Sequence, residues 1–150
     1  MSYSARKRWA AVLSVAFLAG VVLLSMPAQA DASASDDLWL MARTIYAEAA
    51  GEPYMGKVAV GAVIMNRVRS PLFPNTVAGV IYEPWQFSCV GNWMFNSRPD
   101  QDSLNAARDA MNGVDPTGGA LFYFNYHTVT NSWLWAKPFA ARIGNHWFTY

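Results

Sequence analysis

The chain has 150 residues, of which 53% are hydrophobic and 15% aromatic, with a formal net charge of +1 and one cysteine. This length and apolar content allow one domain with its own core, and a single cysteine excludes an intrachain disulfide. The charge lacks the basic excess that phosphate binding requires, which excludes the common nucleic-acid-binding classes.

Residues 1–30 have the three parts of a secretory signal peptide. Basic residues at positions 6–8 precede a charge-free apolar stretch from Trp9 to Ser25, and Ala28-Gln29-Ala30 is a small-residue cleavage site. We therefore predict export to the periplasm, cell envelope or exterior, with cleavage after Ala30 and no stable membrane insertion afterwards. The alternative is an uncleaved membrane anchor, although the apolar stretch is slightly shorter than the ~20 residues of a typical span.

Cleavage would remove three of the 11 basic residues and none of the 10 acidic ones, leaving a net charge of −2. That charge argues against nucleic acid as a partner and against strong attraction to an anionic membrane. We expect a short tail at residues 31–37, followed by one monomeric domain at 38–150 that uses no cofactor. Cys89 is interpreted as a small buried apolar residue.

Apolar spacing predicts four helices in the first part of this domain. The first begins with an aspartate cap at position 36 or 37 and ends near Ala49, before a glycine and a proline. The second, from Tyr54 to Arg69, is so apolar that it should be nearly buried. A short helix is predicted over 75–82 with Asn75 as its cap, and a longer one over 101–112.

Loops and strands are the main elements predicted for the C-terminal part of the domain. Residues 83–99 are irregular yet aromatic, which is unusual unless the loop lines a site. A turn is predicted at 115–119 and strands at 121–124 and 143–150, with Trp147 and Phe148 in the core. The spacing of Trp133 and Trp135 predicts that one faces inward and one outward. The predicted class is α+β, mostly helical, with a small β element toward the C-terminus.

Glu48 is the first candidate for chemistry. It lies near the end of an apolar helical run, and the helix expected behind it is also apolar. A glutamate held against apolar side chains tends to stay protonated, and can then donate a proton to a leaving oxygen, as glycan-cleaving enzymes require. The alternative is an ordinary surface glutamate at a helix end.

Two other carboxylates lie in plausible positions. Glu52 is interpreted as a turn residue that bonds to backbone donors and supports the site, and Glu83 lies in the aromatic loop. A retaining glycosidase would need two carboxylates about 5 Å apart, and an inverting one a pair roughly 6.5–9.5 Å apart. The sequence does not supply these distances.

Aromatic and amide side chains give a second signal for sugar binding. Sugar rings stack on aromatic side chains, while amides and hydroxyls bond to hydroxyl and acetamido groups; the alternative is that most of these aromatics are core. There is no H-E-x-x-H or Cys/His cluster, no G-x-S-x-G element and no phosphate loop. The candidates are Trp85, Trp93, Tyr123, Tyr126, Trp133 and Trp135, with Gln86, Ser88, Asn92, Asn125 and Asn131 among them.

Several motifs occur in a fixed order over nearly the whole domain. They are ARTIYAEAAGEPY at 42–54, the run Val58–Val68, and the shorter segments at 73–77, 80–84, 86–88, 115–118, 123–125 and 143–146. This series closely resembles the SleB-like cell wall hydrolases, the spore-cortex-lytic family. The family's usual arginine is Ala50 here, and the peptidoglycan-binding repeat common in spore-cortex members is not expected.

The resemblance implies a lysozyme-like or lytic-transglycosylase-like domain that cuts peptidoglycan glycan strands, with the family's catalytic glutamate at Glu48. That residue would protonate the oxygen between N-acetylmuramic acid and N-acetylglucosamine, then act as base on the muramic C6 hydroxyl to give a 1,6-anhydro product. No metal is expected. The expected substrate-binding residues are Glu52, Gln86, Ser88, Tyr123, Asn125 and Trp133.

Three alternatives stay open at this point. A muramidase would use water in place of the C6 hydroxyl, with Glu52 or Glu83 assisting. An amidase would cut the muramoyl–peptide bond and would want a metal site. A non-catalytic glycan-binding module would keep the aromatic groove without the chemistry.

Overall fold

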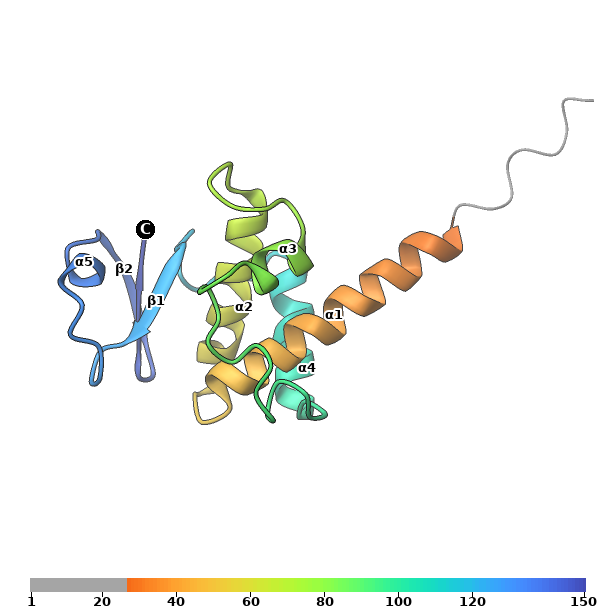
Figure 1. Cartoon of the computed structure of the whole chain (residues 1–150), viewed down its shortest axis with the longest axis horizontal. Helices are drawn as coiled ribbons and strands as arrows, with labels where there is room; N and C mark the ends of the chain where they lie inside the picture. Colours follow the sequence, from red (N-terminus) through yellow and green to blue (C-terminus); the bar gives the residue numbers. More distant parts are fainter. Residues whose placement is uncertain (1–26) are drawn as a thin grey trace, which may run out of the picture. The chain divides into compact units, whose positions relative to one another are not determined.

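The computed structural model describes residues 27–150 (Figure 1). The chain divides into two units, Met1–Ser33 and Ala34–Tyr150. Helices and a small antiparallel sheet confirm the predicted α+β class. The elements are α1 (Pro27–Ala49), α2 (Tyr54–Arg69), α3 (Val77–Tyr82), α4 (Gln101–Met111), β1 (Phe122–Asn125), α5 (Ser132–Trp135), β2 (Phe139–Ile143) and β3 (His146–Thr149).

Helix α1 begins earlier than predicted. Its first residue is Pro27, so positions 31–37 are helical rather than a tail. This stretch is rich in alanine, the best helix former, and proline is tolerated in a first helical turn. The predicted cleavage site falls within α1, whereas most of the predicted signal peptide lies at residues 1–26, outside the described part. None of the helices within 27–150 is long and apolar enough to cross a membrane.

Helix α2 is the centre of the core, as its apolar sequence predicts. It begins and ends at the predicted residues and contacts α3, α4, β1 and β2. Val58, Val60 and Ile64 are inaccessible to solvent. Burial on all sides removes most of its apolar surface from water, and this provides the main driving force for assembling the domain.

Close approach of three helices depends on Gly61 of α2. A Cβ at this position would lie 2.8 Å from the Cβ of Ala110 on α4 and 3.1 Å from Cδ1 of Ile45 on α1. The missing side chain therefore lets α1 and α4 pack directly onto the α2 backbone. This contact fixes the C-terminal half of α1 against the core.

The short helix predicted after α2 is present, but its cap is a different residue. Helix α3 begins at Val77 because Thr76, rather than Asn75, caps it: the Thr76 hydroxyl accepts a 3.0 Å hydrogen bond from the amide of Gly79. The amide of the third residue after the cap is an ordinary partner for such a hydroxyl. Residues 83–100 are irregular, and α4 then ends at Met111.

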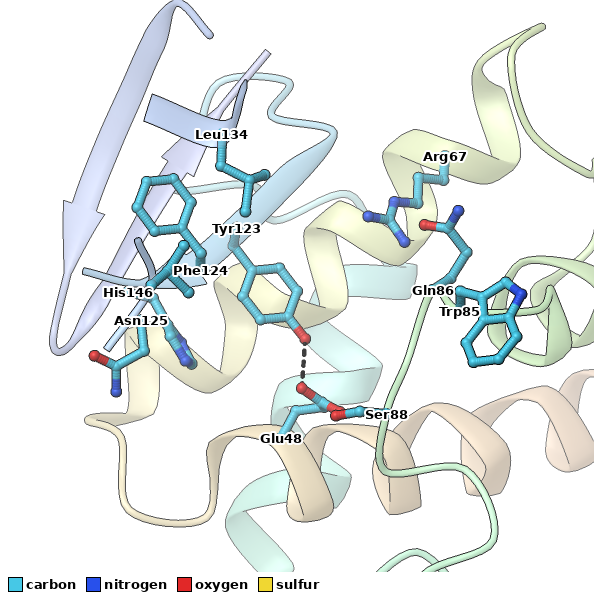
Figure 2. Close-up of a pocket in the computed structure, with 11 residues that line it drawn as sticks. Glu48, Arg67, Trp85, Gln86, Ser88, Tyr123, Phe124, Asn125, Leu134 and His146 are labelled. Atoms are coloured by element: carbon cyan, nitrogen blue, oxygen red, sulfur yellow. Dashed lines mark hydrogen bonds between the residues drawn. The ribbon is translucent and has the colours of Figure 1, made fainter. Parts of the chain in front are cut away.

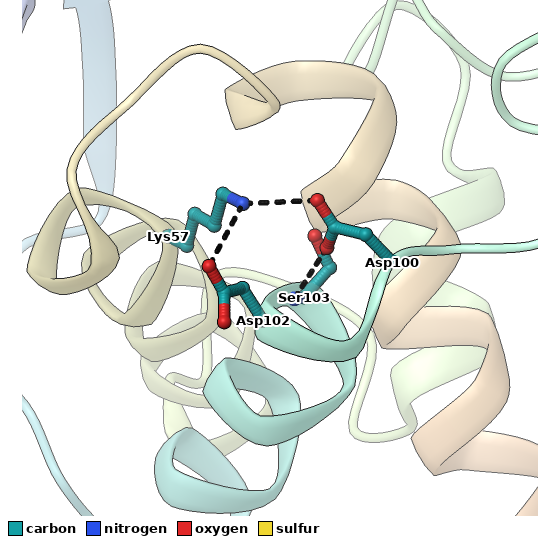
Figure 3. Close-up of polar contacts among 4 residues, drawn as sticks. All are labelled: Lys57, Asp100, Asp102 and Ser103. Atoms are coloured by element: carbon teal, nitrogen blue, oxygen red, sulfur yellow. Dashed lines mark hydrogen bonds and ion pairs between the residues drawn. The ribbon is translucent and has the colours of Figure 1, made fainter.

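A buried lysine of α2, Lys57, forms an ion pair with the residue that caps the start of α4 (Figure 3). Asp100 caps α4 by accepting a 2.7 Å hydrogen bond from the amide of Ser103, and its Oδ2 lies 3.1 Å from Nζ of Lys57. Asp102 is farther from this Nζ, at 4.0 Å. Partial burial raises the pKa of Asp100, but the hydrogen bonds from Ser103 and Lys57 outweigh it, so the net shift is downward.

We expect Asp100→Asn to keep the helix cap but to remove the closer of the two ion pairs of Lys57, lowering the free energy of unfolding by about 1–2 kcal/mol at pH 7. A carboxylate with a depressed folded-state pKa stabilises fully above its unfolded pKa of about 4, and this contribution is lost as the pH falls through the folded-state pKa. The difference between parent and variant in urea unfolding should therefore shrink below about pH 4. Asp102→Asn is the matched control and should change little. A difference that stays constant down to acidic pH would contradict this assignment.

The sheet has the antiparallel order β1-β3-β2. Strand β1 lies one residue later than predicted, and the strand predicted over 143–150 is instead part of a hairpin, with β2 ending at Ile143 and β3 starting at His146. Gly144 has a φ of +58° and reverses the chain between them. Phe148 is fully buried against Ala59 and Val63 of α2, which joins the sheet to the core.

A short helix, α5, lies where the sequence suggested an alternating segment. Trp133 and Trp135 both lie on it and are 57% and 44% exposed, so the prediction that one faces inward is wrong. Helix α5 has only four residues and none of them is buried, so neither of its faces is covered by the core. Trp133 packs edge-on against Phe122, and Trp135 against Phe124.

Candidate active site

Glu48 lies in the last turn of α1 and faces strand β1 (Figure 2). The hydroxyl of Tyr123 points at its carboxylate and donates a 3.0 Å hydrogen bond to Oε2. Oε1 is buried and has no hydrogen-bond partner within residues 27–150. Because α1 packs on α2 and stops after Ala49, the carboxylate is held in one place between the helices and the sheet.

A pocket of about 390 Å³ opens beside this carboxylate. Five of the predicted site residues line it together, although they come from α1, the loop after α3, and β1. The sequence separates Glu48 and Tyr123 by 75 positions, and the fold brings them into hydrogen-bond contact. The lining residues are Glu48, Arg67, Trp85, Gln86, Ser88, Tyr123, Phe124, Asn125, Val129, Leu134 and His146.

Tyr123 can donate its hydrogen bond to Glu48 at any pH in the neutral range. Burial, followed by the charge and the hydrogen bond of Glu48, raises the pKa of Tyr123 well above its ordinary value of 10. Its hydroxyl therefore keeps its proton throughout the neutral range and orients one carboxylate oxygen. The ring is fixed in turn by packing against His146 and Phe148 of β3.

Tyr123→Phe should remove this hydrogen bond without changing the shape of the ring. Since a hydrogen bond to a charged group contributes about 1.5–3 kcal/mol, we expect cleavage to slow by roughly 10- to 100-fold. The loss should appear in kcat with KM nearly unchanged, because the hydroxyl contacts Glu48. The measurement is the rate of glycan cleavage together with the melting temperature. A variant that cleaves at the parental rate would show that Tyr123 does not position Glu48.

Glu52 lies outside the pocket and performs the turn role predicted for it. Its Oε2 accepts a 2.8 Å hydrogen bond from the amide of Asn145, and its Oε1 a 3.1 Å bond from the side-chain amide of the same residue. These bonds tie the β2–β3 turn to the α1–α2 turn. Glu52 thereby sets the position of His146, the next residue, which does line the pocket.

Trp133 and Glu83 are also absent from the pocket lining within the described residues. Trp133 instead packs with Phe122 and with Lys137, whose Nζ lies 4.4 Å from the centre of its ring. Glu83 is near Arg67, but its Oε2 is buried without a hydrogen-bond partner in the part of the chain that the structure describes.

Arg67 and His146 line the pocket and were not predicted as site residues. Arg67 is 4% exposed and donates from Nε to the carbonyl of Leu121 at 2.8 Å. Burial lowers its pKa, opposed by Tyr123 and Glu83, but an arginine keeps its charge at any ordinary pH. Burial likewise lowers the pKa of His146, opposed by Glu52 and Glu48, so its imidazole is neutral at pH 7. The available signal was their place in the motifs at 58–68 and 143–146.

Cys89 is buried, as predicted. Burial, and after it the nearby carboxylate of Glu48, raises the pKa of its thiol. A protonated thiol is a poor nucleophile, and Cys89 belongs to the hydrophobic core. Among residues 27–150, no three His, Cys, Asp or Glu side chains are placed to hold a metal ion together.

The chain is similar to known cortex-lytic proteins. The chain is 50% identical over 113 residues to a spore cortex-lytic enzyme of Halalkalibacterium halodurans, a match covering 75% of this chain and 34% of that enzyme. It is 49% identical to the solved catalytic domain of the Bacillus cereus SleB protein, with a TM-score of 0.73, over 77% of this chain and 91% of that one. The germination-specific lytic transglycosylase SleB from Bacillus anthracis gives the same identity and TM-score over 77% and 94%.

The chain thus spans about a third of the length of the H. halodurans enzyme and nearly all of the solved catalytic domains. A family model described as Cell Wall Hydrolase matches residues 51–149, a range that begins just after Glu48 and includes the rest of the pocket. On this match, the chain belongs to the cell wall hydrolase family.

Proposed function

We propose that this domain cleaves peptidoglycan glycan strands between N-acetylmuramic acid and N-acetylglucosamine as a lytic transglycosylase. The observation that carries the proposal is that Glu48 is the only acidic residue lining the pocket within residues 27–150. Two-carboxylate hydrolysis would need a second one in reach of the same bond. Glu52 is bonded to Asn145, and Glu83 lies outside the lining.

One carboxylate is sufficient if the substrate supplies its own nucleophile. Glu48 donates its proton to the glycosidic oxygen as the bond from that oxygen to muramic C1 breaks. The resulting carboxylate then takes the proton of the muramic C6 hydroxyl while that oxygen bonds to C1. The products are a free 4-hydroxyl and a 1,6-anhydro end, and Glu48 is protonated again for the next cycle.

The other pocket residues have matching roles in this scheme. Tyr123 holds Oε2 in place, so the proton is carried by a carboxylate of fixed orientation. Gln86, Ser88 and Asn125 offer amide and hydroxyl groups to the sugar hydroxyl and acetamido groups. The names of the relatives support the substrate class, since they are called cortex-lytic enzymes or a lytic transglycosylase.

The products of digestion test this proposal. Purified peptidoglycan is incubated with the protein, and the soluble fragments are identified by mass. We expect fragments ending in 1,6-anhydromuramic acid. Reducing muramic ends would indicate a muramidase, released stem peptides an amidase, and binding to glycan without any cleavage a non-catalytic module.

We also propose that residues 1–30 direct export and are removed after Ala30, and that the domain acts as a monomer. The n-region, apolar stretch and small-residue site support cleavage, and the boundary between the two units of the chain, after Ser33, lies close to the proposed site. N-terminal sequencing of the protein from the envelope fraction should begin at Asp31, whereas a retained Met1 would contradict cleavage.

A further inference from the structure

Trp85 has a backbone conformation that a tryptophan seldom adopts. Its φ is +69°, and it is the only non-glycine residue within 27–150 with a positive φ. The amide of Gln86 bonds to the carbonyl of Glu83 at 3.2 Å, which closes a turn with Pro84 second and Trp85 third. A proline followed by a residue of positive φ is the pattern of a type II turn, where glycine is the expected third residue. A large side chain at this position is strained.

The strained residue makes no compensating contact within the fold. The side chain of Trp85 is 100% exposed, so its burial contributes nothing to stability. Two other exposed tryptophans do pack: Trp133 against Phe122 and Trp135 against Phe124. No aromatic or cation–π contact of Trp85 occurs with any described residue. Both faces of its indole are therefore open.

The position of Trp85 beside the pocket accounts for its strained conformation better than a contribution to stability does. It lines the pocket that holds Glu48, and the next residue, Gln86, lines the same wall (Figure 2). Strain of this kind concentrates at sites where it positions a group for a ligand. The exposed, flat indole matches the apolar C–H face of a pyranose ring, and the neighbouring amide can bond to that ring's polar substituents.

We propose that Trp85 is a stacking platform for one sugar ring of the glycan strand, at the rim of the pocket beside Glu48. This inference rests on the proposed glycan-cleaving function and assigns one of its binding subsites. The positive φ turns the indole outward, and the rigid Pro84 before it limits the motion of the turn. The turn thereby fixes the point and direction in which the indole leaves the backbone before substrate arrives, which reduces the ordering that binding requires.

The test measures binding separately from cleavage. The parent is Glu48→Gln, and the probe is a soluble tetrasaccharide of alternating N-acetylglucosamine and N-acetylmuramic acid, titrated by calorimetry. Adding Trp85→Gly or Trp85→Ala should raise the Kd roughly 10-fold, the loss expected for one aromatic stacking contact. Trp93→Ala is the matched control, because Trp93 is 74% exposed in the same loop but does not line the pocket, and it should leave the Kd unchanged.

Unfolding experiments on the same variants separate binding from folding. Because glycine accepts a positive φ without strain, Trp85→Gly should raise the folded-to-unfolded ratio roughly 2- to 5-fold, whereas Trp85→Ala should not. Three binding results would overturn the inference: Trp85 variants that bind like the parent, a Trp93→Ala variant that binds equally weakly, or a parent that does not bind the tetrasaccharide. In the unfolding experiments, a Trp85→Gly variant that is less stable than the parent would overturn it. The proposed function fails on a different result, namely the absence of anhydro ends from digestion by the unsubstituted protein.

Discussion

Glu48→Gln is expected to abolish glycan cleavage, with a loss of at least about 10³-fold in rate. Glutamine keeps the size of the side chain and can still accept the hydrogen bond from Tyr123, so the pocket should keep its shape. It has no proton to transfer to the glycosidic oxygen and no carboxylate to take one from the C6 hydroxyl. General acid–base catalysis alone contributes about 10²–10⁴-fold, and here one residue performs both steps.

The control for this result is Glu83→Gln. The described residues include three glutamates, of which Glu52 is fixed in a turn and Glu83 lies in the loop next to the pocket. Rates of fragment release, the melting temperature and glycan binding are measured for both variants. Glu83→Gln should cleave within a few fold of the parent. An equal loss in the two variants would mean that a second carboxylate takes part.

Gly144→Ala is expected to lower the free energy of unfolding by about 2–4 kcal/mol. Gly144 has a φ of +58°, which disfavours any side chain, and a Cβ there would overlap the carboxylate of Glu52 and lie 2.8 Å from Cδ of Pro53. The turn must then move away, and the two hydrogen bonds between Asn145 and Glu52 are lost. Cleavage should also weaken, since the hairpin carries His146 into the pocket.

Gly91→Ala is the control that separates the cost of backbone strain from the cost of the overlap with Glu52. Gly91 also has a positive φ, +88°, but nothing lies within 4 Å of a Cβ placed on it. Its substitution should therefore lower the free energy of unfolding by only about 1 kcal/mol in urea titrations. Equal losses in the two variants would show that the contact between Gly144 and Glu52 does not contribute to stability.

Local patterns in the sequence were sufficient to locate α2, α3, α4 and the end of α1. The bounds of α2 were predicted correctly because a dense apolar run lies between a proline and a Ser-Pro break, and such signals act over a few residues. The turn role of Glu52 was predicted for the same reason, from the Gly and Pro on either side of it. Its partner, Asn145, lies 93 positions away and could not be identified.

The errors lie where structure depends on distant partners. Strand β2 was missed because its neighbour β3 supplies its hydrogen bonds, and Gly144 within the predicted strand was the signal for a hairpin. Helix α5 is too short for apolar periodicity to detect. Arg67 and His146 lie within the motifs at 58–68 and 143–146, but they reach the pocket only through the packing of α2 and β3, so the motifs assigned them no role.

Digestion of peptidoglycan in oxygen-18-labelled water tests the central claim most directly. If the C6 hydroxyl of the substrate is the nucleophile and Glu48 takes its proton, the new ends are 1,6-anhydromuramic acid and no label enters the fragments. Reducing ends that carry oxygen-18 at C1 would show that water is the nucleophile, and would contradict the single-carboxylate transglycosylase mechanism.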